Sequence, residues 1–112
     1  MNERGAAAEE AALRYLLARG MRLKARNYQC RLGEIDLIFD HDGTLVFVEV
    51  RQRRSSAFGG AAESITVRKR SKLMATARHY LSGSASMPPC RFDAILVNGD
   101  GTIEWIRDAF GE

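Results

Sequence analysis

Residues 34–51 read EIDLIFDHDGTLVFVEVR, two apolar runs joined by Asp42-Gly43. Asp-Gly between alternating hydrophobic runs is a favoured dipeptide for the two-residue turn of a β-hairpin. The stretch therefore predicts an antiparallel hairpin, and counting outward from the turn places Asp36 directly opposite Glu49. Paired side chains on one face of a hairpin have Cβ atoms about 5 Å apart. Two carboxylates are thus expected side by side on the same face of the sheet.

The same register predicts which residues surround the two acids. Side chains alternate between faces along a strand, so Glu34 and Arg51 should form a second pair on the acid-bearing face. The opposite face is predicted to carry four apolar residues: Ile35, Leu37, Val48 and Val50. The acid-bearing face continues with Ile38 and Phe47, and these apolar surroundings should strengthen the repulsion between the carboxylates. A positive group is therefore expected between the acids.

Two interpretations provide this positive group. In the first, Arg51, Arg53 or Arg31 neutralises the acids, and the ion cluster only stabilises the sheet. In the second, Asp36 and Glu49 bind a divalent cation, Mg²⁺ or Mn²⁺, for which one or two carboxylates and substrate phosphates are the usual ligands. The sequence does not favour zinc, because no Cys-x-x-Cys or His-x-x-x-His spacing occurs.

Composition indicates the class of protein. A chain of 112 residues is expected to form one domain, 1–112. Cys30 and Cys90 lack the spacing of a disulfide framework, and no apolar stretch resembles a signal peptide or a membrane span. These features predict a cytoplasmic protein without a membrane partner. The net charge of +3 and the pI of about 9.2 favour a polyanionic partner. His41 is expected to lie in a solvated turn.

Two elements are predicted before the hairpin. A helix should run from Gly5 to Arg19 and stop at Gly20. Its inward stripe comprises Glu9, Ala12, Leu13, Leu16 and Leu17. Glu9 should therefore lie at the edge of the buried face. A half-buried strand is predicted over residues 21–27, with apolar and basic residues in alternation. Its inward residues are Met21, Leu23 and Ala25.

A second helix is predicted over residues 66–81, after a Ser-, Gly- and Ala-rich connector at residues 52–64. Its apolar stripe comprises Leu73, Ala77, Tyr80 and Leu81, and its first turns carry Arg68, Lys69, Arg70 and Lys72. Cations at a helix N-terminus oppose the macrodipole, so an anion should compensate, either the site carboxylates or phosphate. Lys69 precedes Leu73 by four residues and should project towards the site. Arg68 and Arg70 are expected to be solvated.

The chain should end in a strand pair, residues 91–97 and 102–106, joined by the turn at 98–101. Phe92 and Trp105 are expected in its core. With this pair, the chain is predicted to combine a sheet of several strands with two helices.

Several separated motifs together resemble a known family. They are, in chain order, Ala8-Glu9, Ala12, Tyr15-Leu16, Arg26-Asn27, residues 33–38, residues 47–53, Lys69 and residues 91–93. In this order and approximate spacing they resemble the YraN-like, or UPF0102, family of small bacterial proteins over nearly the whole chain. That family is similar to the restriction-endonuclease-like PD-(D/E)xK superfamily and to archaeal Holliday-junction resolvases. The resemblance implies an α/β fold, a restriction-endonuclease-like mixed β-sheet flanked by helices.

The resemblance also implies metal-dependent phosphodiester hydrolysis. It makes Asp36 and Glu49 the ligands of Mg²⁺ or Mn²⁺, and Glu9 a supplementary acid near the metal or its water. The family pattern has lysine two residues after Glu49, where this chain has Arg51. Arginine stays protonated and cannot serve as a general base, but it can stabilise charge on the phosphate. Lys69 is the candidate to supply the missing ammonium group.

The implied partner is nucleic acid, with DNA, including branched DNA, as the first candidate. Its contacts are expected at Arg53, Arg54, Lys69 and Lys72. Analogy with resolvases, which cut two strands, suggests a homodimer. Two alternatives stay open. Arg51 favours a non-catalytic nucleic-acid-binding module, in which it pairs with Glu34 or Asp36 and silences the site. The composition of residues 52–64 would suit a protein-interaction adaptor.

Overall fold

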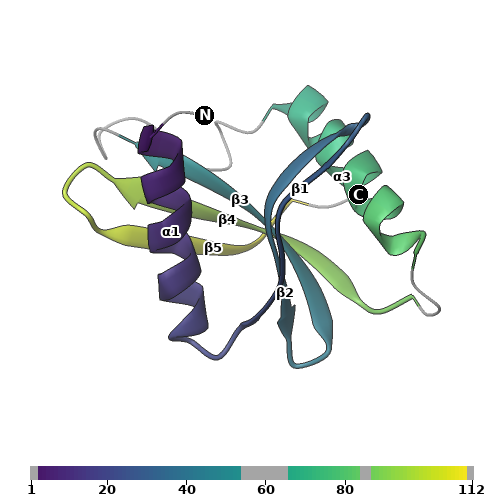
Figure 1. Ribbon diagram of the computed structural model, residues 1–112, viewed down its shortest axis with the longest axis horizontal. Helices are drawn as coiled ribbons and strands as arrows, with labels where there is room; N and C mark the ends of the chain where they lie inside the picture. The colour runs from purple at the N-terminus through teal and green to yellow at the C-terminus, as the bar shows by residue number, and fades with distance from the viewer. Residues whose placement is uncertain (1–2, 54–65, 84–86, 111–112) are drawn as a thin grey trace.

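The computed structural model describes residues 3–53, 66–83 and 87–110 (Figure 1). Its elements in chain order are α1 (Glu3–Leu17), β1 (Arg22–Cys30), β2 (Gly33–His41), β3 (Thr44–Arg53), α3 (Val67–Leu81), β4 (Cys90–Asn98) and β5 (Ile103–Phe110). The strands form one sheet in the order β1-β2-β3-β4-β5. β3 and β4 are parallel and the other neighbours antiparallel. Within the described residues, this mixed sheet with two helices confirms the predicted α/β class and is compatible with a restriction-endonuclease-like fold.

The hairpin of β2 and β3 has the register that the Asp-Gly turn predicts. Asp42 and Gly43 have φ angles of 52° and 92°, and a type I′ turn requires positive values at both positions. The Asp40 carboxylate accepts the Gly43 N–H at 3.1 Å and so stabilises the turn. Paired residues run from His41–Thr44 to Leu37–Val48. The local sequence is therefore sufficient to fix this hairpin.

The pairing ends just before the two acids, so Asp36 does not occupy a paired position in the ladder. Its carboxylate instead accepts the Val50 N–H at 2.8 Å. The neighbouring strand is also irregular here, since Asn27 has a left-handed φ of 50°. Beyond this break the alternation of β2 is reversed. Ile35 packs under α3, whereas the sequence predicted that it would share a face with Leu37.

Two apolar clusters cover opposite faces of the sheet. The cluster beneath α1 consists of Ala8, Ala12, Leu13, Leu16, Met21, Leu37, Phe39, Val46, Val48, Val50, Ile95 and Val97. The cluster beneath α3 consists of Ile35, Ile38, Leu45, Phe47, Leu73, Ala77, Leu81, Ala94, Leu96 and Phe110. In Figure 1, α1 crosses the sheet near β3, β4 and β5, and α3 lies beside β1 and β2. No helix in the described ranges combines the length and apolarity needed to cross a bilayer.

Two residues of the predicted inward stripes are exposed instead. Leu17 is 46% exposed, because α1 ends there and its buried stripe stops at Leu16. Leu23 is 37% exposed, because a register shift between Leu23 and Ala25 interrupts the alternation of β1. The first difference arises from a helix end and the second from a bulge. The periodicity of apolar residues predicts neither feature.

A close contact between β2 and α3 positions the helix over the end of the sheet. A Cβ atom at Gly33 would lie only 2.8 Å from the Thr76 Oγ1, so a larger residue would push α3 away. Thr76 is fully buried, and its hydroxyl donates a hydrogen bond to the Lys72 carbonyl at 2.7 Å. This contact holds the first half of α3, with Lys69 and Lys72, near the acidic residues of β2 and β3.

Candidate metal and nucleic-acid site

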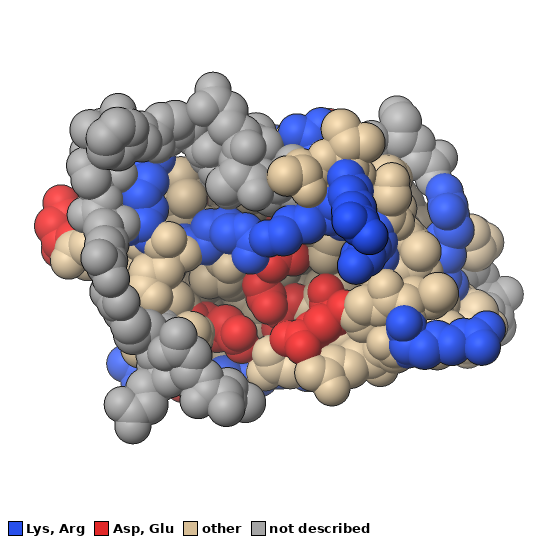
Figure 2. All heavy atoms as spheres, turned by 90° about the horizontal axis from the view of Figure 1, so that it is seen from above, with Lys and Arg blue, Asp and Glu red and all other residues tan. Residues whose placement is uncertain are grey.

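A hollow lies where β2, β3 and α3 meet. It has a volume of about 180 Å³ and is lined by Gly33, Glu34, Glu49, Arg51, Lys69, Lys72 and Leu73. A second hollow adjoins it at Glu34 and is lined by Glu9, Asn27, Gln29 and Glu34. Figure 2 shows acidic side chains gathered in a depression beneath a band of Lys and Arg. The chain thus combines an acidic floor with a basic rim.

The side chains of Asp36 and Glu49 are in direct contact, although the two residues do not form the ladder pair that the hairpin register predicted. Glu49 is buried, and Asp36 is half-buried. Burial, a hydrogen bond with Asp36 and the negative charge of Asp36 together raise the pKa of Glu49 to about 9. Arg51 and Lys69 lower this pKa, but the desolvation and the second acid outweigh them. Two adjacent carboxyl groups therefore favour a shared proton or a bound cation over two uncompensated negative charges.

Arg51 pairs with Glu49, and not with Glu34 or Asp36 as one alternative predicted. Its Nη1 lies 3.1 Å from the Glu49 Oε1. Its Nε is buried and has no hydrogen-bond acceptor among the described residues. A buried donor without an acceptor lowers stability, and a phosphate oxygen is well suited to accept from a guanidinium group. Arg51 is thus both a partner of Glu49 and a candidate contact for phosphate.

Glu9 reaches the same acidic group from α1. Burial raises the pKa of Glu9, and the negative charges of Asp36 and Glu34 raise it further. A hydrogen bond from Asn27 and the positive charge of Arg26 act in the opposite direction. The predicted supplementary acid therefore lies close to Asp36, in surroundings that favour its protonated form.

The N-terminal half of α3 brings Lys69 and Lys72 to the rim of the hollow. Both residues are exposed. Thr66 caps the helix by accepting the Lys69 N–H at 3.2 Å, and the first turn has no acidic residue. The positive end of the helix dipole therefore adds to the lysine charges. The positive charge of Lys69 lowers the pKa of Glu49, so the site carboxylates supply part of the predicted compensation.

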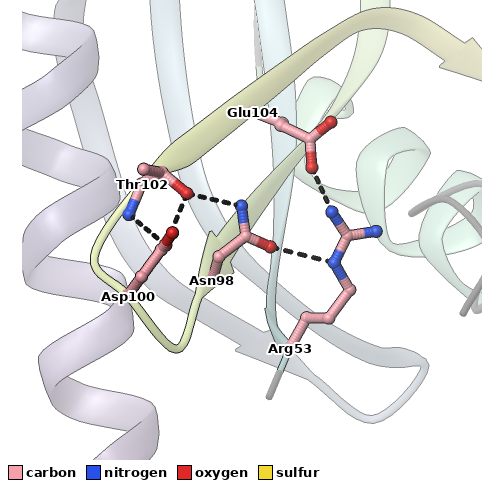
Figure 3. Close-up of polar contacts among 5 residues, drawn as sticks. All are labelled: Arg53, Asn98, Asp100, Thr102 and Glu104. Carbon is pink, nitrogen blue, oxygen red and sulfur yellow. Dashed lines mark hydrogen bonds and ion pairs between the residues drawn. The ribbon is translucent and has the colours of Figure 1, made fainter. Parts of the chain in front are cut away.

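Other predicted cations are engaged elsewhere or lie outside the description. The Arg53 Nε donates to the Asn98 Oδ1 at 2.9 Å, and its guanidinium forms an ion pair with Glu104 (Figure 3). Arg53 thus links β3 to the last two strands. Arg54 and most of the 52–64 connector lie outside the described residues, although residues 52–53 extend β3. Arg70 was expected to be solvated, but it lies over the Phe110 ring, 5.8 Å from its centre.

Two lining residues were not predicted as members of the site. Glu34 had been placed on the acid-bearing face, but its position between the two hollows was not foreseen. Gln29 donates a hydrogen bond to it at 2.5 Å. Asn27 was named only as part of the Arg26-Asn27 motif of the family resemblance. In the structure it forms a hydrogen bond with Glu9. An Asn within a basic strand was the available signal, because Asn adopts left-handed backbone angles more readily than most residues.

The carboxylate pair fits a divalent cation that prefers oxygen ligands. Within the described residues, no group of three or more His, Cys, Asp and Glu side chains is arranged to hold a metal. Asp36 and Glu49 would therefore be supplemented by water and phosphate oxygens, which is the usual arrangement for Mg²⁺. Replacement of their shared proton by a cation would also relieve the repulsion between them. The chemistry of the donors therefore suits Mg²⁺ or Mn²⁺.

The chain also matches a known protein family in sequence. The model of UPF0102, an uncharacterised protein family, matches residues 8–97. The chain belongs to the UPF0102 family. The matched range of this UPF0102 chain contains Glu9, Asp36, Glu49, Arg51 and Lys69 and ends before β5. The resemblance noted in the sequence is therefore confirmed at the level of the family.

Similar UPF0102 proteins occur in several bacteria. One from Nitrosomonas europaea is 54% identical, with 97% of this chain and 94% of the relative covered. Another from Methylobacillus flagellatus is also 54% identical, with 98% of each chain covered. A third from Paracidovorax citrulli is 56% identical, with 95% of this chain and 81% of the relative covered. The similarity thus extends over nearly the full length of this chain.

We expect the metal-free protein to lose stability as the pH rises from about 5 to about 9. Glu49 has a folded pKa of about 9 against an ordinary value of 4.5, so the folded state binds more protons in this window. The free energy of unfolding should fall by up to about 1.4 kcal/mol per pH unit. Urea unfolding in EDTA across this range measures the slope. Glu49→Gln should remove most of this slope, leaving the smaller contribution of Glu9, whereas the control Glu10→Gln should keep it. An unchanged slope in Glu49→Gln would contradict the assignment.

Proposed function

We propose that this protein is a metal-dependent phosphodiester hydrolase of the endonuclease type that acts on nucleic acid. DNA, including branched DNA, is its first candidate substrate. The contact between Asp36 and buried Glu49 supports this most strongly. Two acids held together lower the stability of the fold unless a proton or cation compensates. A purely structural ion pair with Arg51 would need only one of them.

The positions of the residues support distinct roles. Asp36 and Glu49 would hold Mg²⁺ or Mn²⁺. When bound, the ion would activate a water nucleophile and neutralise charge on the phosphate. Lys69 and the Arg51 guanidinium would place further positive charge against the phosphate as negative charge develops on it. The buried Arg51 Nε is a donor that a phosphate oxygen would satisfy.

Glu9 is the side chain best suited to accept the proton of the attacking water. Arg51 remains protonated and cannot do so. Glu9 has a raised pKa and lies near Asp36, and a general base works best when its pKa is close to the working pH. The hydrogen bond with Asn27 would orient the Glu9 carboxylate for this role.

A non-catalytic nucleic-acid-binding module is the second candidate function. The ion pair between Arg51 and Glu49, with 3.1 Å between the paired atoms, favours it. In this case Arg51 would take the place of a metal ion, and the basic rim alone would contact phosphates. Cleavage with Mg²⁺ or Mn²⁺ distinguishes the two functions, because binding alone needs neither ion.

The predicted cytoplasmic location and homodimer belong to the same proposal. A dimer would present two hollows to the two strands of a branched duplex. Light scattering with and without a four-way DNA junction would measure the oligomeric state. A monomer in both conditions would contradict the homodimer and leave a hydrolase that cuts one strand at a time.

Removal of charge at Lys69 and Lys72 should weaken DNA binding. These exposed residues line the hollow, and each phosphate contact contributes to affinity by releasing counterions. We expect the Lys69→Gln/Lys72→Gln variant to bind roughly tenfold more weakly at low salt, with a shallower dependence on salt concentration. Fluorescence anisotropy of labelled DNA in EDTA measures binding without cleavage.

Lys24→Gln is the matched control, because Lys24 is an exposed lysine of β1 outside the lining of the hollow. It should retain nearly the parental affinity. Equal weakening in both variants would assign the effect to net charge rather than to the rim of the hollow. Unchanged affinity in the Lys69→Gln/Lys72→Gln variant would remove the rim from the binding site.

A further inference from the structure

A second basic surface lies on the α1 side of the sheet, whereas the hollow opens beside α3. It consists of Arg19, Tyr15, Trp105 and Arg107, here called the arginine–aromatic row. The Arg19 Cζ lies 3.4 Å from the centre of the Tyr15 ring. The rings of Tyr15 and Trp105 meet edge to face with centres 6.5 Å apart. The Arg107 Cζ lies 4.9 Å from the centre of the Trp105 ring. Two adjacent rings therefore form a continuous path with a guanidinium group at each end.

Buried Asp93 fixes the row from beneath. Its carboxylate accepts the Trp105 Nε1–H at 2.8 Å, the Asp108 N–H at 2.9 Å and the Arg91 Nε–H at 3.0 Å. Arg91 also donates to the His41 Nδ1 at 2.9 Å, since arginine can only donate. His41 was predicted in a solvated turn, but it is partly buried, with its ring 6.2 Å from that of Trp105. Trp105 is thus held in one orientation.

The charge of this surface is greater than core packing requires. Arg19 and Arg107 are exposed, whereas Tyr15 and Trp105 are partly buried against the cluster beneath α1. The nearby acids Asp42 and Asp108 are exposed, and buried Asp93 is satisfied by its donors. A covering for the core would need the rings but not the Arg107 guanidinium group, whereas the Arg19 guanidinium group also donates to the Tyr15 carbonyl at 3.1 Å near the end of α1. Two rings flanked by two exposed guanidinium groups suit a ligand that has both negative charge and flat apolar faces.

Single-stranded nucleic acid has both properties. Its bases stack on aromatic rings and guanidinium planes, while its phosphates attract cations. We propose that the arginine–aromatic row binds the bases of a single-stranded nucleic-acid segment, at a place separate from the acidic hollow. This inference rests on the proposed function, because the bound strand would belong to the same nucleic acid that enters the hollow.

Tryptophan fluorescence tests this proposal directly, because Trp105 is the only tryptophan in the chain. The protein in EDTA is titrated with labelled oligothymidine, and Trp105 emission is recorded together with the anisotropy of the label. We expect the stacking of bases to quench Trp105 over the same concentration range in which the DNA binds. Heparin is a polyanion without bases and should leave the emission unchanged.

Variants of Arg107 separate stacking from charge. Arg107→Gln should shift the quenching midpoint to about fivefold higher DNA concentration, within the range for loss of one stacking contact. Arg107→Lys should recover only part of this loss, since lysine keeps the charge but lacks the planar group. Arg14→Gln is the matched control, because it removes an exposed arginine from the last turn of α1 outside the row. It should keep the parental midpoint.

The outcomes distinguish this proposal from the proposed function. DNA binding detected by anisotropy without quenching of Trp105 would overturn the role of the row and leave the hollow as the binding site. A change of Trp105 emission with protein concentration alone would mean that a second copy covers the row, which would also overturn it. Quenching that persists in the Lys69→Gln/Lys72→Gln variant would support a separate contact. Failure to bind DNA even at low salt would overturn both proposals.

Discussion

Asp36→Asn will abolish metal-dependent cleavage of nucleic acid. The rate should fall by roughly a hundredfold or more, because a metal ligand contributes several kcal/mol of transition-state stabilisation. Asn keeps an oxygen that can accept the Val50 N–H, so the end of β2 should stay in place. It removes the negative charge that the metal requires. Initial rates with labelled DNA in Mg²⁺ or Mn²⁺ measure the loss, and calorimetry should show weaker Mn²⁺ binding.

Asp40→Asn is the matched control for this variant. Asp40 lies on the same strand and also accepts a backbone N–H, that of Gly43 at 3.1 Å. It lies near the hairpin turn and does not line the hollow. Its neutralisation should leave both cleavage and Mn²⁺ affinity close to the parental values. Parental cleavage and Mn²⁺ affinity in Asp36→Asn would show that Asp36 is not a metal ligand.

Arg51→Lys will raise the rate of Mg²⁺-dependent cleavage by roughly tenfold, because lysine offers a compact ammonium group whose pKa can shift. DNA affinity should change little, because both residues are cationic. The change should also weaken the ion pair that now holds the Glu49 carboxylate, 3.1 Å away. Cleavage rates and anisotropy, measured on the same DNA, separate the chemical step from binding.

A fall in cleavage by Arg51→Lys would give the opposite assignment. Arginine would then be the residue that promotes cleavage, with its planar guanidinium group binding the scissile phosphate through two hydrogen bonds. In that case Lys69→Ala should impair turnover by a smaller factor than Arg51→Ala, since Lys69 lies at the exposed rim. Equal effects of these two alanine variants would contradict a special role for the guanidinium group.

The centre of the fold was predictable because its determinants are local. The Asp42-Gly43 turn and the alternation beside it specify the hairpin register from His41–Thr44 to Leu37–Val48, and this register brings the two strands together just before Asp36 and Glu49. The spacing of Lys69 from Leu73 likewise predicted that Lys69 faces the site, and Lys69 does line the hollow. These predictions needed only turn geometry and the periods of strand and helix.

The details next to Asp36 depend on a neighbouring strand and could not be predicted in the same way. The left-handed Asn27 lies on β1, and the hairpin sequence contains no information about it. Its irregularity coincides with the end of the ladder at Asp36 and with the reversed position of Ile35. The sequence also revealed that Arg51 replaces the family lysine. It did not predict that Arg51 pairs with Glu49, because Glu34, Asp36 and Glu49 were all expected near Arg51.

Long-range partners explain the remaining differences. Arg53 forms an ion pair with Glu104, and His41 accepts from Arg91, fifty residues away in the chain. Each of these contacts joins strands that are distant in sequence. The contacts of Arg91 and Trp105 with Asp93 lie within the predicted pair β4 and β5, but strand periodicity does not specify these side-chain partners. Periodicity predicts which face a residue occupies, but not which residue from another strand meets it there.

The hydrolase function is tested most directly by a cleavage assay with Mg²⁺ or Mn²⁺. The substrates are linear duplex, single-stranded and four-way-junction DNA, with RNA beside them, and the proteins are the parent, Arg51→Lys and Asp36→Asn. We expect metal-dependent cleavage by the parent, faster cleavage by Arg51→Lys and none by Asp36→Asn. The contradicting result is that neither the parent nor Arg51→Lys cuts any of these substrates while both still bind them. The proposed hydrolase function would then be wrong, and the protein would be a nucleic-acid-binding module.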